Sequence, residues 1–144
     1  MFRTGFEDIR VGDVVTSLGR TIDTADLLAY SMLSGDWAAH HIDAEYTART
    51  RCRGRIAHGT IPLAAVFGLL RLPPGSTWKL IYGLRSVRWI APVRIGDTIR
   101  GRLQVKGKVD GEGPTGTLDL GFSVLNQGDD KVIVAPLKAE VARG

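Results

Sequence analysis

Residues 61–72 read IPLAAVFGLLRL and are apolar around almost the whole circumference of a helix. A helix of this kind must be covered by protein on most sides, whereas an ordinary surface helix keeps one polar face. Pro62 suits its first turn, and Pro73 with Pro74 ends it. The rest of the chain therefore has to supply a surface that wraps around this segment.

That surface follows in the sequence as segments with a period of two. Apolar and polar residues alternate in the segments 78–90, 97–109, 116–127 and 131–142. Such alternation is typical of strands with one buried face. Short connections rich in turn residues separate the segments, so we predict a meander of four successive antiparallel strands. With an earlier β-branched strand at 14–22, the chain is predicted to form one α+β domain, residues 1–144, in which a sheet curls around the helix.

The region before the central helix has its own pattern. A capped helix is predicted over residues 23–35, where an Asp begins it and a Gly ends it. Its apolar residues fall on one face: Ala25, Leu28, Ala29 and Met32. Residues 35–43, GDWAAHHID, are predicted to form a loop, and residues 43–50 one or two helical turns.

Composition narrows the classes of partner. The net charge of +4 suits an anionic ligand, but it looks too diffuse to demand nucleic acid. Cys52 is the only cysteine, which excludes an intrachain disulfide and a Cys-rich metal site and fits a reducing compartment. The start of the chain shows no secretory signal, and no apolar run is long enough to span a bilayer. We expect a cytoplasmic protein that uses neither nucleic acid nor membrane as a partner.

All three histidines of the chain, His40, His41 and His58, lie within the stretch from Asp36 to Gly59. An imidazole titrates near neutral pH and can exchange protons together with a carboxylate. The crowding therefore indicates a candidate acid–base site. Asp36 on its own is explained equally well as the cap of the following turn.

Two spaced motifs resemble the MaoC-like dehydratase family, which includes the R-specific enoyl-CoA hydratases. The family has a loop that reads roughly G-D-x-N-P-x-H, which Asp36 and His41 match, and an R-I-A-H-G element that residues 55–59 match in full. The segment VRWIAPVRIGDTIRGRLQV, residues 87–105, is similar to a later strand–turn–strand of the family. The resemblance covers most of the chain and implies a hotdog fold, a sheet wrapped around a central helix.

The chain departs from the family pattern at three alanines. Ala38 and Ala39 stand where the family has Asn and Pro, and Ala64 stands where many relatives have a Ser in the central helix. These departures remove polar support around the Asp–His pair. They predict an altered choice of substrate, slower chemistry or lost activity.

The resemblance implies a hydro-lyase that reversibly hydrates a trans-2-enoyl thioester to a 3-hydroxyacyl thioester. Asp36 and His41 would hold and activate the water, and the backbone amide of Gly59, at the start of the central helix, would polarise the thioester carbonyl. Four further residues are candidates for binding the substrate: Trp37, Arg55, His58 and Ala64. Trp37 can equally be a packing anchor, and His58 can shape the loop before the helix.

Two sets of arginines leave alternatives open. One set is Arg49, Arg51, Arg53 and Arg55, and the other is Arg85, Arg88, Arg100 and Arg102. Arginine pairs well with the phosphates of coenzyme A, but both sets can equally be solvated basic edges.

The expected partners follow from the reaction. The substrate would be an acyl-CoA or, as second choice, an acyl-carrier-protein thioester. No cofactor or metal is expected, because coenzyme A is part of the substrate, and hotdog proteins commonly form homodimers or higher homo-oligomers. Two alternatives stay open: a non-catalytic thioester-binding partner subunit of a dehydratase assembly, and a hotdog thioesterase.

Overall fold

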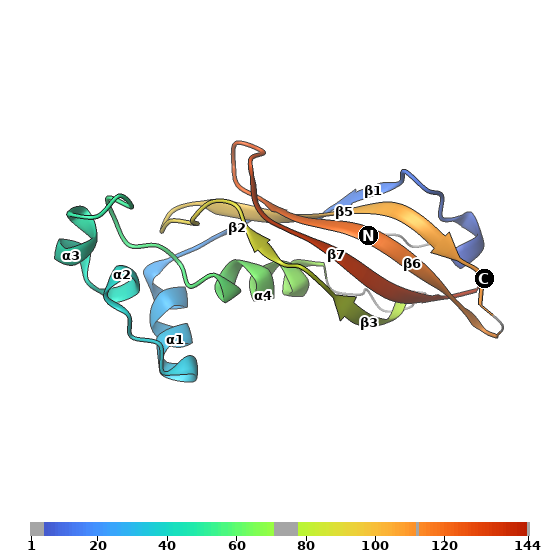
Figure 1. The fold of residues 1–144 in the computed structure, drawn as a ribbon, viewed down its shortest axis with the longest axis horizontal. Coiled ribbons are helices and arrows are strands. Elements are labelled where there is room, and N and C mark those ends of the chain that lie inside the picture. Colours follow the sequence, from blue (N-terminus) through green and yellow to red (C-terminus); the bar gives the residue numbers. More distant parts are fainter. Residues whose placement is uncertain (1–4, 71–77, 112, 144) are drawn as a thin grey trace.

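The computed structural model describes residues 5–70, 78–111 and 113–143 (Figure 1). The helical elements are η1 (Phe6–Asp8), α1 (Thr24–Ser34), α2 (Ala39–Ile42), α3 (Ala44–Ala48) and α4 (Thr60–Leu69). The strands are β1 (Val14–Thr16), β2 (Arg20–Thr21), β3 (Trp78–Leu84), β4 (Arg88–Trp89), β5 (Thr98–Val109), β6 (Thr115–Leu125) and β7 (Lys131–Ala142).

The strands form one antiparallel sheet in the order β1-β5-β6-β7-β3, with β2 beside β5 and β4 beside β7. The prediction of strands is confirmed, but the prediction of four successive neighbours is wrong. Only β5, β6 and β7 form a meander, because β3 pairs with β7 and β1 takes the edge beside β5. Two predicted strands are also divided: 78–90 into β3 and β4, and 14–22 into β1 and β2.

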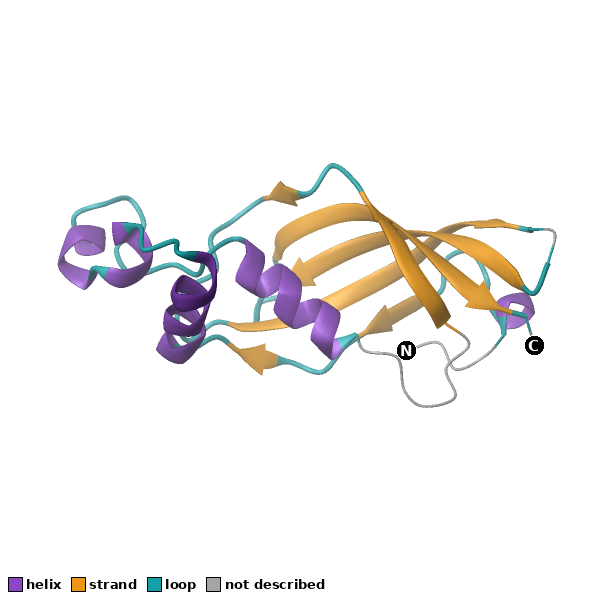
Figure 2. Ribbon diagram, turned by 90° about the horizontal axis from the view of Figure 1, so that it is seen from below, coloured by secondary structure: helices purple, strands orange, loops and turns teal. Residues whose placement is uncertain are grey.

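Helix α4 lies against one face of the sheet, as Figure 2 shows. Its Val66 is fully buried, and Phe67 stacks on Phe122 of β6 with ring centroids 5.2 Å apart. The contact with β5 is so close that a Cβ on Gly101 would lie 2.3 Å from a methyl of Val66. The central helix is therefore confirmed over Thr60–Leu69, but it ends three residues before the predicted Leu72, and Pro73 with Pro74 lies outside the described residues.

Helix α1 is confirmed by its caps. Asp23 and Asp26 form a reciprocal capping box, and Gly35 ends the helix in the left-handed region with φ 75°. The helix buries Leu27 and Ser31, however, and not the apolar face predicted from spacing. Of that face, Leu28 is 43% and Met32 76% exposed.

Helices α1, α2 and α3 gather beyond one end of the sheet, near the start of α4 (Figure 1). The prediction of an unbroken loop at 35–43 is wrong, because residues 39–42 form α2. The predicted turn at 43–50 is confirmed as α3, which Asp43 caps by accepting from the amide of Tyr46. No helix among the described residues is both long and apolar enough to cross a membrane.

Candidate active site

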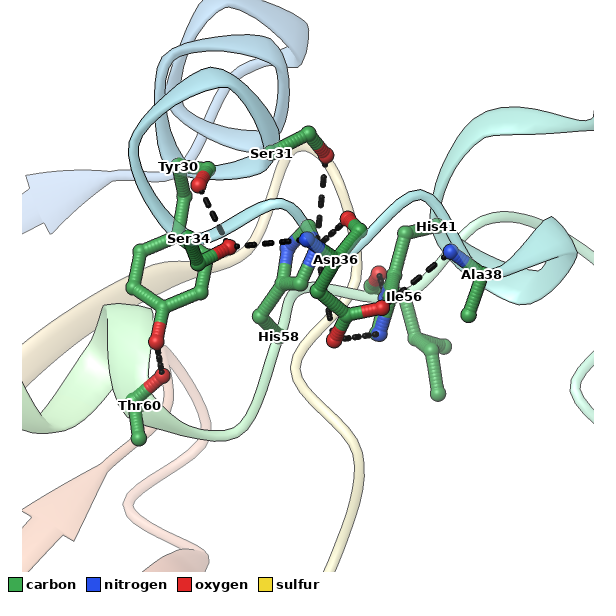
Figure 3. A network of polar contacts seen from close by, with 9 residues as sticks. All are labelled: Tyr30, Ser31, Ser34, Asp36, Ala38, His41, Ile56, His58 and Thr60. Atoms are coloured by element: carbon green, nitrogen blue, oxygen red, sulfur yellow. Dashed lines mark hydrogen bonds and ion pairs between the residues drawn. The ribbon is translucent and has the colours of Figure 1, made fainter.

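Three segments meet at the start of α4 and bring the predicted acid–base residues together. Asp36 follows the glycine that ends α1, His41 lies on α2, and His58 comes two residues before the first residue of α4. Figure 3 shows these side chains pointing toward one another. Residues that are up to 22 positions apart in the sequence therefore share one site.

The two carboxylate oxygens of Asp36 have different surroundings. Oδ1 accepts a hydrogen bond from the amide of Ala38 at 3.1 Å and so supports the turn into α2. Oδ2 lies 3.9 Å from Nε2 of His41 and 4.0 Å from Nε2 of His58. The capping role and the acid–base role are therefore compatible, because each uses a different oxygen.

His41 is buried and its tautomer is fixed by the backbone. Its Nδ1 donates to the carbonyl of Ile56 at 2.8 Å, and a carbonyl can only accept, so Nδ1 carries the proton. In the neutral ring, Nε2 then keeps its lone pair and faces the carboxylate of Asp36. Their separation of 3.9 Å is too long for a direct hydrogen bond.

The surroundings of His41 lower the pKa of its imidazole below the ordinary value of 6.5. Burial has the largest effect, because it disfavours the charged ring, and the nearby His58 and His40 rings act in the same direction. The hydrogen bond to Ile56 and the carboxylate of Asp36 act in the opposite direction. His41 is therefore set to be the neutral, proton-accepting form at neutral pH.

His58 is almost fully buried and contacts the other two residues. Its Nε2 donates to the backbone carbonyl of Asp36 at 3.0 Å and lies 3.4 Å from the hydroxyl of Ser31. Its ring stacks on His41 with centroids 3.7 Å apart, and its Nδ1 has no partner among the described residues. His58 therefore supports the loop that carries Asp36, in agreement with the loop-shaping alternative.

Gly59 comes directly before α4, where the first backbone N–H groups of a helix lack partners within it. The space that a side chain would fill is occupied, since a Cβ on Gly59 would lie 2.6 Å from Nε1 of Trp89. The same Nε1 donates to the carbonyl of Gly59 at 2.8 Å. Glycine at this position thus lets the Trp89 indole pack against the backbone.

A cavity of about 380 Å³ joins the site to the start of α4. Its lining is Tyr30, Ser34, Asp36, His58, Gly59, Thr60 and Trp89. Sequence reasoning missed Tyr30 and Thr60, whose hydroxyls are hydrogen-bonded, and Trp89. Their positions depend on the packing of α1 and β4 around α4, which no local motif specifies.

The other predicted residues, and His41 with them, are not among the residues that line this cavity. Trp37 is half-exposed, and Arg55 donates to the hydroxyl of Thr24 at 3.2 Å. Ala64 lines a second cavity of about 460 Å³ between α1 and α4, which is mostly apolar and shares Tyr30 with the first. His40 is exposed, and its ring lies against His41 with centroids 3.9 Å apart.

Asp36, His41 and His58 could also be considered as metal ligands, because their ligand atoms all lie within 4.8 Å of one another. The hydrogen bonds argue against this arrangement. Nε2 of His58 donates to a carbonyl, so in this tautomer it has no free lone pair for an ion. The cluster is better suited to proton transfer than to holding an ion.

Known proteins share the sequence pattern. A family model described as "MaoC like domain" matches residues 9–123. The chain is 40% identical over 108 residues to the (R)-specific enoyl-CoA hydratase of Rhodospirillum rubrum, covering 72% of this chain and 71% of that protein. It is 36% identical over 107 residues to the protein MaoC of Klebsiella aerogenes, covering 74% of this chain but 32% of that protein. The chain thus spans about a third of the second relative's length.

The fold is also shared with solved structures. A Mycobacterium tuberculosis protein described as a double hotdog fold superposes with a TM-score of 0.80 and 21% identity, over 97% of this chain and 44% of that one. At this identity the likeness concerns the fold alone. It confirms the predicted hotdog arrangement of a sheet and a central helix.

Proposed function

Because the chain belongs to the MaoC-like domain family, we propose that it is a hydro-lyase that reversibly hydrates a trans-2-enoyl thioester to a 3-hydroxyacyl thioester. The observation that carries the proposal is the 3.9 Å gap between Oδ2 of Asp36 and Nε2 of His41, beside a cavity that reaches Gly59. The hydratase names of relatives support the same reaction class.

The gap between Asp36 and His41 suits one water molecule. Both facing atoms are acceptors when His41 is neutral, so a water between them donates both hydrogens and turns its lone pairs outward. In the proposed addition, the water oxygen bonds to the β carbon of the substrate. One water proton passes to the Asp36–His41 pair, and the pair returns a proton to the α carbon, so that one H₂O is added across the double bond.

The thioester carbonyl would be polarised by the amide of Gly59. Gly59 lies at the positive end of the α4 dipole, which would stabilise negative charge on the carbonyl oxygen. Removing one such donor costs about 3 kcal/mol in related acyl chemistry. The apolar cavity between α1 and α4 would then accept the acyl chain.

The three alanines that depart from the family pattern leave the contacts of Asp36 and His41 in place. Ala38 still donates its amide to Asp36, and Ala39 still begins α2. Ala64 lies in the second cavity, away from the Asp36–His41 gap. The structure therefore offers no observation that favours the non-catalytic partner subunit over the enzyme.

The test is the hydration of a short trans-2-enoyl-CoA, followed by loss of the enoyl absorbance. We expect Asp36→Asn and His41→Ala to lower kcat by about 10²- to 10⁴-fold, because each removes one partner of the water. His40→Ala is the matched control, since it deletes the neighbouring exposed imidazole and, assayed well above the acid limb of His41, should retain most of the turnover.

Undiminished turnover in both Asp36→Asn and His41→Ala would refute the assignment of these two residues as the pair that activates water. A thiol reagent added to the same assay separates hydration from thioester hydrolysis, because only a thioesterase releases free coenzyme A. Hydrolysis without hydration would establish the thioesterase alternative instead.

A further inference from the structure

The apolar cavity between α1 and α4 is lined by residues that recur every three or four positions on each helix. Residues with this spacing lie on one face of a helix, so the two helices face each other across the cavity. On α1 they are Asp26, Ala29, Tyr30 and Leu33, and on α4 they are Ile61, Ala64, Ala65, Gly68 and Leu69. The side chains of α4 are small at Ala64 and Gly68, which leaves room for the volume of about 460 Å³.

The lining of this cavity suits a hydrocarbon chain. Among the described residues, its only charged members are Arg20 and Asp26, and these two form an ion pair with each other. The rest of the lining is apolar or small, apart from the hydroxyl of Tyr30. An alkyl chain could therefore lie along α4 without burying an unpaired charge.

Tyr30 stands between the apolar cavity and the candidate site. Of the residues that the structure describes, it is the only one that lines both this cavity and the smaller cavity that contains Asp36 and Gly59. Its ring lies against the buried ring of His58, with centroids 4.7 Å apart. A chain that starts at Gly59 therefore has to pass the Tyr30 ring to reach the apolar cavity.

The Tyr30 side chain is held at both of its ends. Its backbone belongs to α1, and its hydroxyl accepts a hydrogen bond from Thr60, the first residue of α4 (Figure 3). The ring thus spans the two helices that enclose the apolar cavity. Because a tyrosine side chain has only two main rotatable bonds, a hydrogen bond at its tip leaves the ring little freedom to move aside.

We propose that Tyr30, held by Thr60, limits the length of the acyl chain, and that the substrate is a short-chain enoyl thioester. The proposal rests on the proposed function and narrows its substrate class. The cavity on the near side of Tyr30 has a volume of about 380 Å³ and must also hold the thioester group. The apolar cavity accepts only the part of the chain that passes Tyr30. A long chain has to displace the ring, which breaks its hydrogen bond to Thr60 and its contact with His58.

Three variants separate the bulk of the Tyr30 ring from its hydrogen bond. Tyr30→Ala removes the ring and opens the passage. Tyr30→Phe keeps the ring and its contact with His58 but loses the hydrogen bond to Thr60. Met32→Ala is the matched control, because it truncates a large side chain on the same helix that is 76% exposed and lines neither cavity.

The measurement is the ratio of kcat/KM for trans-2-octenoyl-CoA to kcat/KM for trans-2-butenoyl-CoA. A general loss of activity through His58 cancels from this ratio, because both substrates meet the same chain. We expect the original chain to favour the butenoyl substrate. Tyr30→Ala should raise the ratio by about tenfold or more, since even one methylene in an apolar pocket gives about tenfold discrimination. Tyr30→Phe should raise it by less, and Met32→Ala should leave it unchanged.

A second change tests whether the longer chain lies in the apolar cavity. Ala64→Leu adds bulk to this cavity from α4, so in combination with Tyr30→Ala it should return the ratio toward its original value. Thermal unfolding verifies that all variants fold. A preference of the original chain for the octenoyl substrate would overturn the proposal, and so would equal ratios in the original chain and Tyr30→Ala. A raised ratio that Ala64→Leu leaves unchanged would also overturn it.

Binding separates the failure of this proposal from the failure of the proposed reaction. Calorimetric titration of the full chain with butyryl-CoA and octanoyl-CoA, which have no double bond to hydrate, measures the same preference without turnover. A shift toward octanoyl-CoA in Tyr30→Ala without any hydration would remove the reaction and keep the role of Tyr30. Hydration that depends on Asp36 and His41, with one length preference in both chains, would keep the reaction and remove the role of Tyr30.

Discussion

The imidazole rings of His41 and His58 stack with their centroids 3.7 Å apart and their planes 22° apart. The two rings have opposite tautomers, because His41 donates from Nδ1 to Ile56 and His58 donates from Nε2 to Asp36. His58 thus contacts one member of the proposed pair through its ring and the other through its backbone carbonyl. It also precedes Gly59, so it adjoins every group that the proposed reaction uses.

We predict that His58 positions the pair through two separable contacts. His58→Phe keeps an aromatic ring against His41 but removes the donor to Asp36, and it should lower kcat by about 10²-fold with a smaller change in KM. His58→Gln restores an N–H donor and should recover part of the loss. Steady-state kinetics of both variants, with thermal unfolding as the control for folding, measure this. Equal kcat in the phenylalanine variant and the original chain would show that the hydrogen bond has no positioning role.

The lowered pKa of His41 predicts that kcat/KM stays high to a lower pH than an ordinary histidine would allow. Because the proposed pair would need neutral His41 to accept a proton, kcat/KM should stay high as the pH falls to 6.5 and decline only below it. His40→Ala removes a neighbouring ring that lowers this pKa, so its acid limb should lie at higher pH. The measurement is kcat/KM against pH for both chains. If kcat/KM of the original chain already declined above pH 6.5, burial would not lower the pKa of His41.

The same shift has a consequence for stability. The unfolded chain protonates this histidine near 6.5, before the folded chain does, so the unfolded state binds more protons in that range. Stabilisation by neutral His41 is therefore present above that pH and is lost as the pH falls through the folded pKa.

Local patterns predicted the elements better than their arrangement. The caps of α1 were readable at Asp23 and Gly35, because the residue types act on the adjacent backbone. The edge position of β3 was not readable, since pairing with β7 rather than β5 depends on how the sheet curls around α4. Helical spacing likewise could not tell that α1 would bury Leu27 and leave Met32 exposed.

In the candidate site too, local patterns predicted residues better than they predicted the contacts between distant segments. The motif spacing brought out Asp36, His41 and Gly59, and the structure places them around one cavity or directly beside it. Trp89 could not be found, because it lies on β4 and is 30 residues away from Gly59 in the sequence. Arg88 and Arg102 were visible as arginines on predicted strands, but only the register places them in one row across the sheet, with β6 and β7 between them.

Gly59→Ala should act through Trp89. The new Cβ would lie 2.6 Å from the indole nitrogen, so the indole must move and its hydrogen bond to the Gly59 carbonyl is lost. We expect lower kcat/KM for Gly59→Ala and for Trp89→Ala, and little further loss when the two are combined. A double-mutant cycle on kcat/KM should give a coupling energy of about 0.5–3 kcal/mol. Strictly additive losses would mean that Gly59 acts independently of Trp89.

Substitutions at two glycines with different surroundings test how closely α4 packs against the sheet. Gly101→Ala would place a Cβ 2.3 Å from a methyl of Val66, at a contact of backbone and buried side chain that has little room to yield. Overpacking of this kind should lower the free energy of unfolding by about 1–3 kcal/mol. Gly68→Ala on the exposed side of α4 meets no atom within 4 Å and should raise that free energy by about 0.5–1 kcal/mol, because alanine favours a helix. Urea unfolding of both variants measures the two changes, and a harmless Gly101→Ala would mean that α4 does not lie against β5 as closely as described.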